Sequence, residues 1–391
     1  MANYGERPFE FRVPDTIHVG IGCLERVAAE ASRIGGGKVL VVTDLNVRAT
    51  PMAGKVIDQL SSARLLRGVF SDIPGEPTTT EVEKGLAALE EAKADTVVAI
   101  GGGSVIDTAK SVAVLATNGG SIVDYKGANK IKKAKLPLVV VNTTAGTGSE
   151  VTRFAIITDP VTNVKMLIAD PHLISEVAID DPLLTVTCSP LVTASTGLDA
   201  LTHAIESYVS LRSNTLSDLL ALSAIRKIGQ AIRAAFRNGE DLAARAIMHV
   251  ASLEAGMSFS NASVALVHGM ARPIGAYFHK PHGISNSVLL PYVMEWSIAG
   301  APGRFAEIAR ALGVDTTGLS DMEAAQRAVA EVRAICNDLQ IPRLTGLGID
   351  PNKLMTLAPT MAKDALDSGS PGNNPRVPTA DEIVELYRQA L

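Results

Sequence analysis

The stretch "DTVVAIGGGSVIDTAKSVAVLA" (residues 95–116) decides the fold expected of this 391-residue chain. A short β-branched run leads directly into three consecutive glycines, and a helix-like segment follows them. Glycine lets the backbone approach a ligand closely, and the free N–H groups at a helix N-terminus attract anions. The stretch therefore predicts a buried strand, a turn and a helix that together receive a pyrophosphate. The spacing is not the G-x-G-x-x-G of a Rossmann fingerprint, so a tight structural turn without a ligand is the alternative.

Segments of the same kind flank this stretch in the first half of the chain. "KVLVVTD" (38–44) and "LPLVVVNTTAGTGSE" (136–150) are strand-like, and "TTTEVEKGLAALEEAKA" (78–94) has the apolar spacing of a helix. Buried strands that alternate with amphipathic helices form parallel sheets covered on both faces. We therefore expect an α/β domain over residues 1–184, with a Rossmann-like parallel sheet and helices on both faces.

The second half is different, because it has almost no β-branched runs. Several segments open on Ser, Thr, Asn or Asp and close on Gly or before Pro, as helix ends do. They include residues 214–239, 303–313, 320–340 and 379–391. We expect an all-α domain over residues 185–391, joined to the first near "IDDPLLTVTCSP" (179–190).

Composition narrows the classes of protein. A formal charge of −5 argues against a nucleic-acid-binding surface. The N-terminal stretch "MANYGERPFEFRVPDTIHVG" has no apolar core of a signal peptide, and no apolar run reaches the ~18 residues of a membrane span. Three widely spaced cysteines (Cys23, Cys188, Cys336) suggest a reduced, cytoplasmic compartment.

Polar residues end two of the expected strands. The loop "TTAGTGSEVT" (143–152) should emerge at the same carboxyl edge as the glycines, where open α/β sheets bind ligands. Asp44 ends the first strand, where a carboxylate can accept both hydroxyls of an adenosine ribose and repel a 2′-phosphate. This predicts NAD rather than NADP, while a helix-capping aspartate is the alternative interpretation of Asp44.

Four residues in the second half have the spacing of a metal site. Asp199 and His203 are four residues apart, on one face of a helix. His268 and His282 are fourteen apart, and Pro273, Gly275 and Pro281 should break the chain between them so that the rings converge. One carboxylate and three imidazoles suit Fe²⁺, Zn²⁺, Mn²⁺ or Ni²⁺, and ligand type alone does not choose among these. Each histidine taken singly could instead be an ordinary hydrogen-bonded residue.

Together these motifs resemble a known family. "GGGSVIDTAK", "TTAGTGSEVT", "TGLDALTHAIESYVS" and "HGMARPIGAYFHKPHG" are similar, in order and spacing, to the signature segments of the iron-containing (group III) alcohol dehydrogenases. The resemblance runs from "IHVGIGCLERVA" to "NPRVPTADEIVELYRQAL", so it covers nearly the whole chain. The glycine loop is also shared with glycerol dehydrogenases and dehydroquinate synthases, so a dehydroquinate synthase-like architecture is implied.

The resemblance implies an NAD-dependent alcohol dehydrogenase or aldehyde reductase of primary alcohols. The resemblance also implies a divalent metal, Fe²⁺ with Zn²⁺ as the alternative, and a homodimer or larger homo-oligomer. The implied metal ligands are Asp199, His203, His268 and His282. The implied cofactor contacts are Asp44, Gly101, Gly102, Gly103, Ser104, Asp107, Thr143, Thr144, Thr147 and Lys165.

One position departs from the family pattern. Many members carry a further histidine four residues after the third ligand, credited with proton relay, and here that residue is Arg272. A guanidinium stays protonated near neutral pH, so it cannot act as a base. His279 is the nearest imidazole in sequence, and bound water or ribose hydroxyls are other candidates.

Arg272 nevertheless stands among the candidate catalytic residues. A cation beside a metal site suggests a substrate with its own carboxylate or phosphonate, such as a hydroxy acid or semialdehyde, unless Arg272 pairs with a structural acid. A dehydroquinate-synthase-like lyase, a glycerol-dehydrogenase-like enzyme and a non-catalytic NAD-binding sensor are the alternative functions. The sequence does not identify the alcohol, the physiological direction or the native metal.

Overall fold

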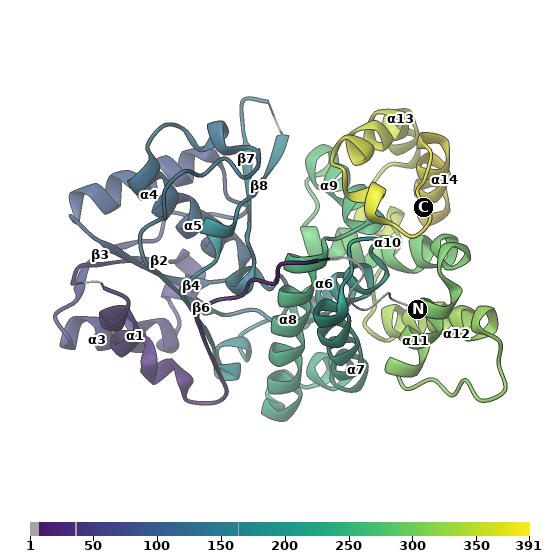
Figure 1. Ribbon diagram of the computed structural model, residues 1–391, viewed down its shortest axis with the longest axis horizontal. Coiled ribbons are helices and arrows are strands. Elements are labelled where there is room, and N and C mark those ends of the chain that lie inside the picture. The colour runs from purple at the N-terminus through teal and green to yellow at the C-terminus, as the bar shows by residue number, and fades with distance from the viewer. Residues whose placement is uncertain (1–7, 36, 163) are drawn as a thin grey trace. The chain divides into compact units, whose positions relative to one another are not determined.

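The computed structural model describes residues 8–35, 37–162 and 164–391, so part of the N-terminal stretch considered above lies outside the described residues. The chain divides into two compact units (Figure 1). One is Arg12–Thr187, and the other is Cys188–Leu391 together with residues 8–11. The sequence had assigned residues 8–11 to the α/β domain and set its end at residue 184. Pro8 and Phe9 line a pocket of the helical unit, with which residues 8–11 are grouped.

The α/β unit is built on a six-stranded parallel sheet. In spatial order its strands are β1 (Thr16–Val19), β9 (Val177–Asp180), β6 (Leu138–Asn142), β4 (Thr96–Gly101), β2 (Val39–Val42) and β3 (Leu66–Phe70). All residues of the four strands between β1 and β3 are buried, as expected of strands covered on both faces.

Two helix layers cover this sheet (Figure 1). Alternate side chains such as Val39 and Val41 form one buried cluster with α1 (Val27–Arg33) and α3 (Pro51–Ser62). Their neighbours, such as Leu40 and Val42, form a second cluster with α4 (Thr79–Glu91) and α5 (Gly103–Asn118). The alternation follows from the two-residue period of a strand, and it confirms the expected α/β class.

A second, three-stranded sheet completes the unit and was not predicted. Its order is β5 (Gly127–Ala128), β8 (Val164–Ala169) and β7 (Phe154–Asp159), and β7 and β8 are antiparallel. The two strands alternate buried and more exposed residues instead of forming continuous apolar runs. This is the pattern of a sheet that is buried on one face.

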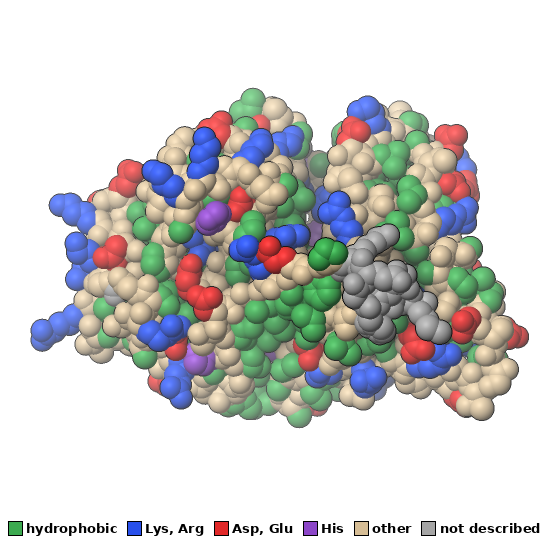
Figure 2. Space-filling view, in the orientation of Figure 1, with side chains coloured by type: hydrophobic (Ala, Val, Ile, Leu, Met, Phe, Trp, Pro, Cys, Tyr) green, Lys and Arg blue, Asp and Glu red, His purple; other side chains and the backbone are tan. Residues whose placement is uncertain are grey.

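The second unit is helical. It contains α6 (Pro190–Val209), α7 (Thr215–Arg237), α8 (Leu242–Ala262), α9 (Leu266–Phe278), α10 (His282–Ser297), α11 (Pro302–Ala311), α12 (Asp321–Asp338), α13 (Pro351–Asp367) and α14 (Ala380–Ala390). Among the described residues, no helix combines the length and apolar character needed to cross a bilayer. Acidic and basic side chains are interspersed over the face shown in Figure 2, so neither sign of charge dominates it.

The predicted chain break within residues 268–282 is confirmed at Pro281, the N-cap of α10, and was wrong for Pro273 and Gly275. α9 continues through Pro273 and Gly275 to Phe278, and the chain turns at His279, whose φ is 52°. Pro273 weakens the helix because it has no N–H to donate. The Tyr387 hydroxyl of α14 donates to the Met270 carbonyl in the same turn, at 2.7 Å, and supports the backbone there.

The turn after β4 yields a stability prediction. A Cβ added to Gly101 would lie 2.6 Å from Val105 Cβ, so Gly101→Ala should lower the free energy of unfolding by about 1–3 kcal/mol through overpacking. Gly54, inside α3, has open space where a Cβ would lie, so Gly54→Ala should raise stability by about 1 kcal/mol. Chemical denaturation of both variants checks this pair. A Gly101→Ala protein as stable as the wild type would contradict the packing argument.

Candidate functional site

The glycine loop and the threonine loop lie against each other. β4 and β6 are paired neighbours, and Thr143 N donates to Gly101 O at 3.1 Å. A Cβ on Gly102 would lie 3.0 Å from Thr144 Cγ2, and one on Gly103 would lie 3.0 Å from Thr147 Cγ2. Both loops therefore meet at the carboxyl edge of the sheet, as the sequence predicted. The close approach accounts for glycine at these positions without any need for a positive φ.

A buried lysine holds the segment that follows the threonine loop. Lys110 Nζ donates to the carbonyls of Ser149, Thr152 and Phe154 at 2.6, 2.8 and 2.9 Å. Burial lowers the pKa of Lys110 to about 8, against the opposing effect of Asp107, so the amine stays mostly charged at neutral pH. Lys110 thereby fixes residues 149–154 to α5. Lys110 is not among the site residues predicted from the sequence, although it ends the stretch "GGGSVIDTAK".

Asp107 supports the same segment. Its carboxylate accepts from Ser149 Oγ at 2.6 Å and from Ile156 N at 2.9 Å. The sequence placed Asp107 among the cofactor contacts, but both of its oxygens are used inside the protein. Ser104 lies in the first turn of α5, where its carbonyl accepts from Thr108 Oγ1 at 2.8 Å.

The other two predicted cofactor residues also have protein partners. Asp44 is the N-cap of α2 (Leu45–Arg48), and its Oδ1 accepts from Asn46 N and Val47 N. The capping role of Asp44 is thus observed, and it occupies one of the two carboxylate oxygens. Lys165, on β8, donates to Glu76 Oε1 at 2.7 Å. These contacts neither require nor exclude a role of Asp44 or Lys165 in cofactor binding.

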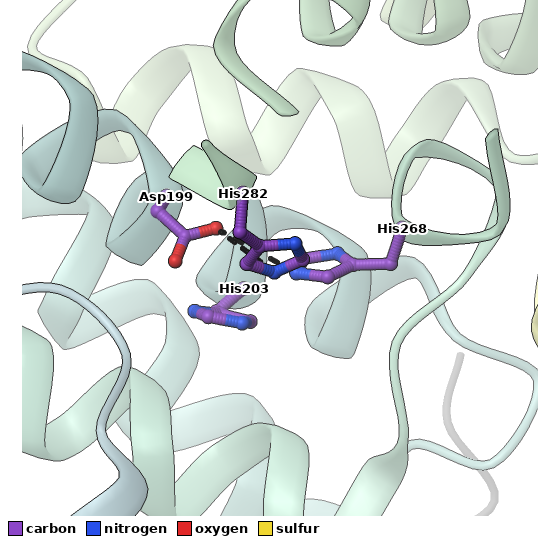
Figure 3. A group of neighbouring side chains, drawn as sticks. All are labelled: Asp199, His203, His268 and His282. Carbon is purple, nitrogen blue, oxygen red and sulfur yellow. Dashed lines mark ion pairs between the residues drawn. The ribbon is translucent and has the colours of Figure 1, made fainter. Parts of the chain in front are cut away.

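In the helical unit, the four predicted metal ligands converge (Figure 3). Asp199 and His203 project from the same face of α6, His268 from the first turn of α9, and His282 from the first residue of α10. One ligand atom from each residue lies within 4.8 Å of those of the other three. Three helices therefore direct one carboxylate and three imidazoles to a single point.

The separations between these atoms fit a shared ion. The Nε2 atoms of His268 and His282 each lie 3.7 Å from Asp199 Oδ1. Two ligands about 2.1 Å from one ion are about 3.4 Å apart at a tetrahedral angle, and somewhat further apart at wider angles. The donor set, three nitrogens and one oxygen, is also one that divalent iron or zinc accepts. The residues present therefore fit a divalent metal.

Burial shifts the pKa values of two of these residues toward their neutral forms. Asp199 is 1% exposed, and burial raises its pKa to about 7. Burial, together with the nearby charge of Arg272, holds the pKa of His268 well below its usual value, so this imidazole is neutral. The rings of His203 and His268 stack with centroids 4.5 Å apart. The neutral imidazole, which keeps a lone pair, is the form that binds metals.

Two residues that were not predicted from the sequence contact this group directly. Glu206 Oε2 lies 2.7 Å from His268 Nδ1. Asn286 Nδ2 lies 2.6 Å from Asp199 Oδ1 and 3.1 Å from the Nε2 atoms of both His268 and His282. Helical spacing could have found both residues, because Glu206 follows His203 by three and Asn286 follows His282 by four.

Arg272 and His279 differ in their relation to the group. Burial lowers the pKa of Arg272, and the nearby Glu206 carboxylate opposes that lowering. Arg272 Nη1 also donates to Ser370 Oγ at 2.9 Å. The guanidinium thus has an acidic neighbour inside the protein. His279 is the exposed C-cap of α9, whereas Asp199, His203 and His268 are buried.

Known proteins match the whole architecture. The iron-containing alcohol dehydrogenase model matches residues 14–182, and the model of the C-terminal part of the same family matches residues 193–391. The 1,3-propanediol dehydrogenase of Klebsiella pneumoniae is 38% identical over 388 residues, 98% of this chain and 99% of that protein.

Solved structures agree with these sequence matches. A crystal structure of 1,3-propanediol oxidoreductase has a TM-score of 0.95 at 38% identity and covers 98% of this chain and 100% of that one. The sulfoacetaldehyde reductase of Bifidobacterium kashiwanohense, solved with NAD⁺, has a TM-score of 0.86 at 27% identity and covers 98% of this chain and 99% of that one.

Fold, loops and converging ligand set therefore define a metal- and nucleotide-dependent oxidoreductase. The chain belongs to the iron-containing alcohol dehydrogenase family, as its motifs predicted. The family converts alcohols and aldehydes with NAD(H) and a divalent metal, typically iron. Its relatives are alcohol dehydrogenases, which favours that activity over the lyase and sensor alternatives.

Proposed function

We propose that Asp199, His203, His268 and His282 hold the divalent metal, with Fe²⁺ as the expected ion and Zn²⁺ as the alternative. The observation that carries this is the convergence of one carboxylate and three imidazoles within 4.8 Å. We further propose that the glycine loop, the threonine loop, Asp44 and Lys165 bind NAD(H), and that Asp107 contributes by holding Ser149. The contact between the two loops supports this assignment.

The reaction is the exchange of a hydride between the substrate carbon and the nicotinamide, and the metal, when bound, polarises the substrate oxygen. In oxidation the alcohol loses a hydride and a proton and becomes an aldehyde. Neutral imidazoles and a single carboxylate leave a net positive charge at the site when it is loaded. Arg272 cannot accept the alcohol proton, so water or a ribose hydroxyl is the proposed relay.

The substrate class, the oligomeric state and the cellular compartment are proposed on the same basis. The substrate is a small primary alcohol or aldehyde, and we propose a homodimer or larger homo-oligomer in the cytoplasm. Cys23, Cys188 and Cys336 form no disulfide with one another or with any other part of the chain that the structure describes, which suits a reduced compartment.

An anionic substrate is a second candidate. A relative is named for sulfoacetaldehyde, an aldehyde that carries a negative charge, and Arg272 lies one helical turn after a proposed metal ligand. The proximity of Glu206 supports the opposite interpretation, in which the charge of Arg272 is already offset within the protein.

Replacement of Asp199 tests the ligand set. Asp199→Ala removes the only carboxylate of the four, so metal binding should weaken by more than about 100-fold and NADH formation should fall with it. Metal content after anaerobic purification and NADH absorbance measure the two effects. Asp218→Ala removes a buried acid that pairs with Arg304 elsewhere in the helical unit, and it serves as the control. Full metal content and turnover in Asp199→Ala would refute the assignment.

A single substitution at Asp44 separates its two possible roles. Asn caps helices as well as Asp, so Asp44→Asn should keep α2 and the melting temperature unchanged. Removal of the charge should lower KM for NADP at least about tenfold, which corresponds to ~1.4 kcal/mol. Steady-state kinetics with both nucleotides measure the preference. An unchanged preference would leave Asp44 with the capping role alone.

The role of Arg272 is tested by substrate discrimination. We expect the ratio of kcat/KM for succinic semialdehyde to that for butanal to change less than about threefold in Arg272→Ala, because Glu206 already offsets the guanidinium. Arg272→Lys, which keeps the charge, is the control. A fall of this ratio by tenfold or more in Arg272→Ala, with the ratio restored in Arg272→Lys, would indicate that the substrate is anionic.

A further inference from the structure

We propose that Glu206 and Asn286 are positioning residues that fix His268, before a metal binds, in the tautomer whose Nε2 carries the lone pair. This deepens the proposed function, because it takes His268 as a ligand. A neutral imidazole has one N–H and one lone pair, and only the nitrogen with the lone pair can coordinate. Two independent contacts, one at each ring nitrogen, support the same assignment.

The first contact is with Glu206. This residue lies on α6, is 2% exposed, and accepts from Ala265 N at 2.8 Å and from Val267 N. Those N–H groups belong to the start of α9, where the N-cap residue supplies no side-chain acceptor of its own. Glu206 thus caps α9 from another helix and is placed as an acceptor at the end of α9 that favours anions.

The contact with the ring follows from this placement. The Oε2 atom that accepts from Ala265 N is also 2.7 Å from His268 Nδ1. Burial raises the pKa of Glu206 to about 7, but both of its oxygens accept from backbone N–H groups, which favours the carboxylate. A carboxylate can only accept, so the proton of the neutral ring then lies on Nδ1. A carboxylate behind the imidazole is the arrangement that fixes tautomer and ring orientation at many metal sites.

The second contact is with Asn286. Its amide group meets Asp199 Oδ1 at 2.6 Å, and a carboxylate oxygen requires a donor there, so the contacting atom is the amide nitrogen. The same nitrogen lies 3.1 Å from His268 Nε2 and 3.1 Å from His282 Nε2. One hydrogen of this amide is directed to Asp199 Oδ1, and the other can be donated to the Nε2 atom of either His268 or His282. A His268 ring with its proton on Nδ1 and its lone pair on Nε2 can accept this second hydrogen, so the contact at Nε2 fits the assignment made at Nδ1.

Arg272 completes the arrangement. Its guanidinium is close enough to Glu206 for each to influence the charge of the other, and Ser370 holds it through Nη1 at 2.9 Å. A buried carboxylate without a nearby cation would be costly. The charge of Arg272 favours the carboxylate form of Glu206, as do the backbone N–H groups of Ala265, Val267 and His268, whose effects are larger.

The tautomer can be observed in the wild-type protein. Metal-free protein labelled with ¹⁵N-histidine should show one His268 ring with its proton on Nδ1, assigned by the loss of that signal in His268→Gln. This measurement needs no functional enzyme and no Glu206 variant. A wild-type His268 ring with its proton on Nε2 would overturn the proposal.

Metal affinity provides the second measurement. In Glu206→Gln an amide replaces the pure acceptor, so the Kd for Zn²⁺, from competition with a chromophoric chelator, should rise about 10–100-fold. Glu254→Gln is the matched control, because Glu254 pairs with Lys227 on the neighbouring helix α7. A Glu206→Gln protein with the Kd of Glu254→Gln and the same His268 tautomer would refute the proposal.

The two proposals fail in different ways. Unchanged Zn²⁺ affinity in Asp199→Ala would remove the ligand set itself, whatever the tautomer of His268. Strong wild-type binding that is lost in Asp199→Ala and kept in Glu206→Gln would retain the ligand set and reject only the positioning role.

Discussion

The helical unit depends on the compensation of buried negative charge. Asp199 and Glu206 lie on one helix and are nearly inaccessible to solvent. Isolated charges in such surroundings cost several kcal/mol unless cations or donors offset them. Two backbone N–H groups donate to Glu206, which is also stabilised by the charge of Arg272. The Asn286 amide donates to Asp199. A divalent ion would supply the remaining positive charge beside Asp199.

In the α/β unit, the space available to the two loops after β4 and β6 is the main constraint. β4 and β6 are adjacent, so the loops that leave them must fit into the space of one strand separation. Gly102 and Gly103 make this possible because their missing side chains leave room for Thr144 and Thr147. Lys110 then fixes the chain after the threonine loop through three carbonyls. Backbone N–H groups at the start of α5 are thereby held at a loop of hydroxyls, an arrangement suited to a phosphate.

The parts of the fold that could be predicted are those with strong local patterns. β2, β4 and β6 are continuous apolar runs because helices cover both faces, and the sequence marks them clearly. β3 contains Arg67 and Gly68 at the edge of the sheet, and β7 and β8 alternate, so their patterns are weaker. Pro273 misled the helix boundaries, since a distant hydroxyl of Tyr387 supports the turn that the proline disturbs. No local pattern contains that contact.

The strength of the local sequence pattern also decides which site residues could be predicted. The proposed ligands Asp199 and His203 could be predicted because their side-chain types and four-residue spacing together indicate metal binding. Glu206 and Asn286 share that helical spacing, but a glutamate or an asparagine on a helix is common on any protein surface. Their importance appears only when α6, α9 and α10 are brought together, because their partners lie 62 and 87 residues away in the chain.

Arg272 shows how the two kinds of information combine. From the sequence, a permanent cation one turn after a metal ligand is unfavourable, and an anionic substrate is the simplest way to separate the two charges. The structure supplies an anion that belongs to the protein: the Glu206 carboxylate bonds to the ring of His268 and attracts Arg272. The cation and the proposed metal site are then linked through one carboxylate, so a change at residue 272 would be expected to act on the proposed site through Glu206 and His268.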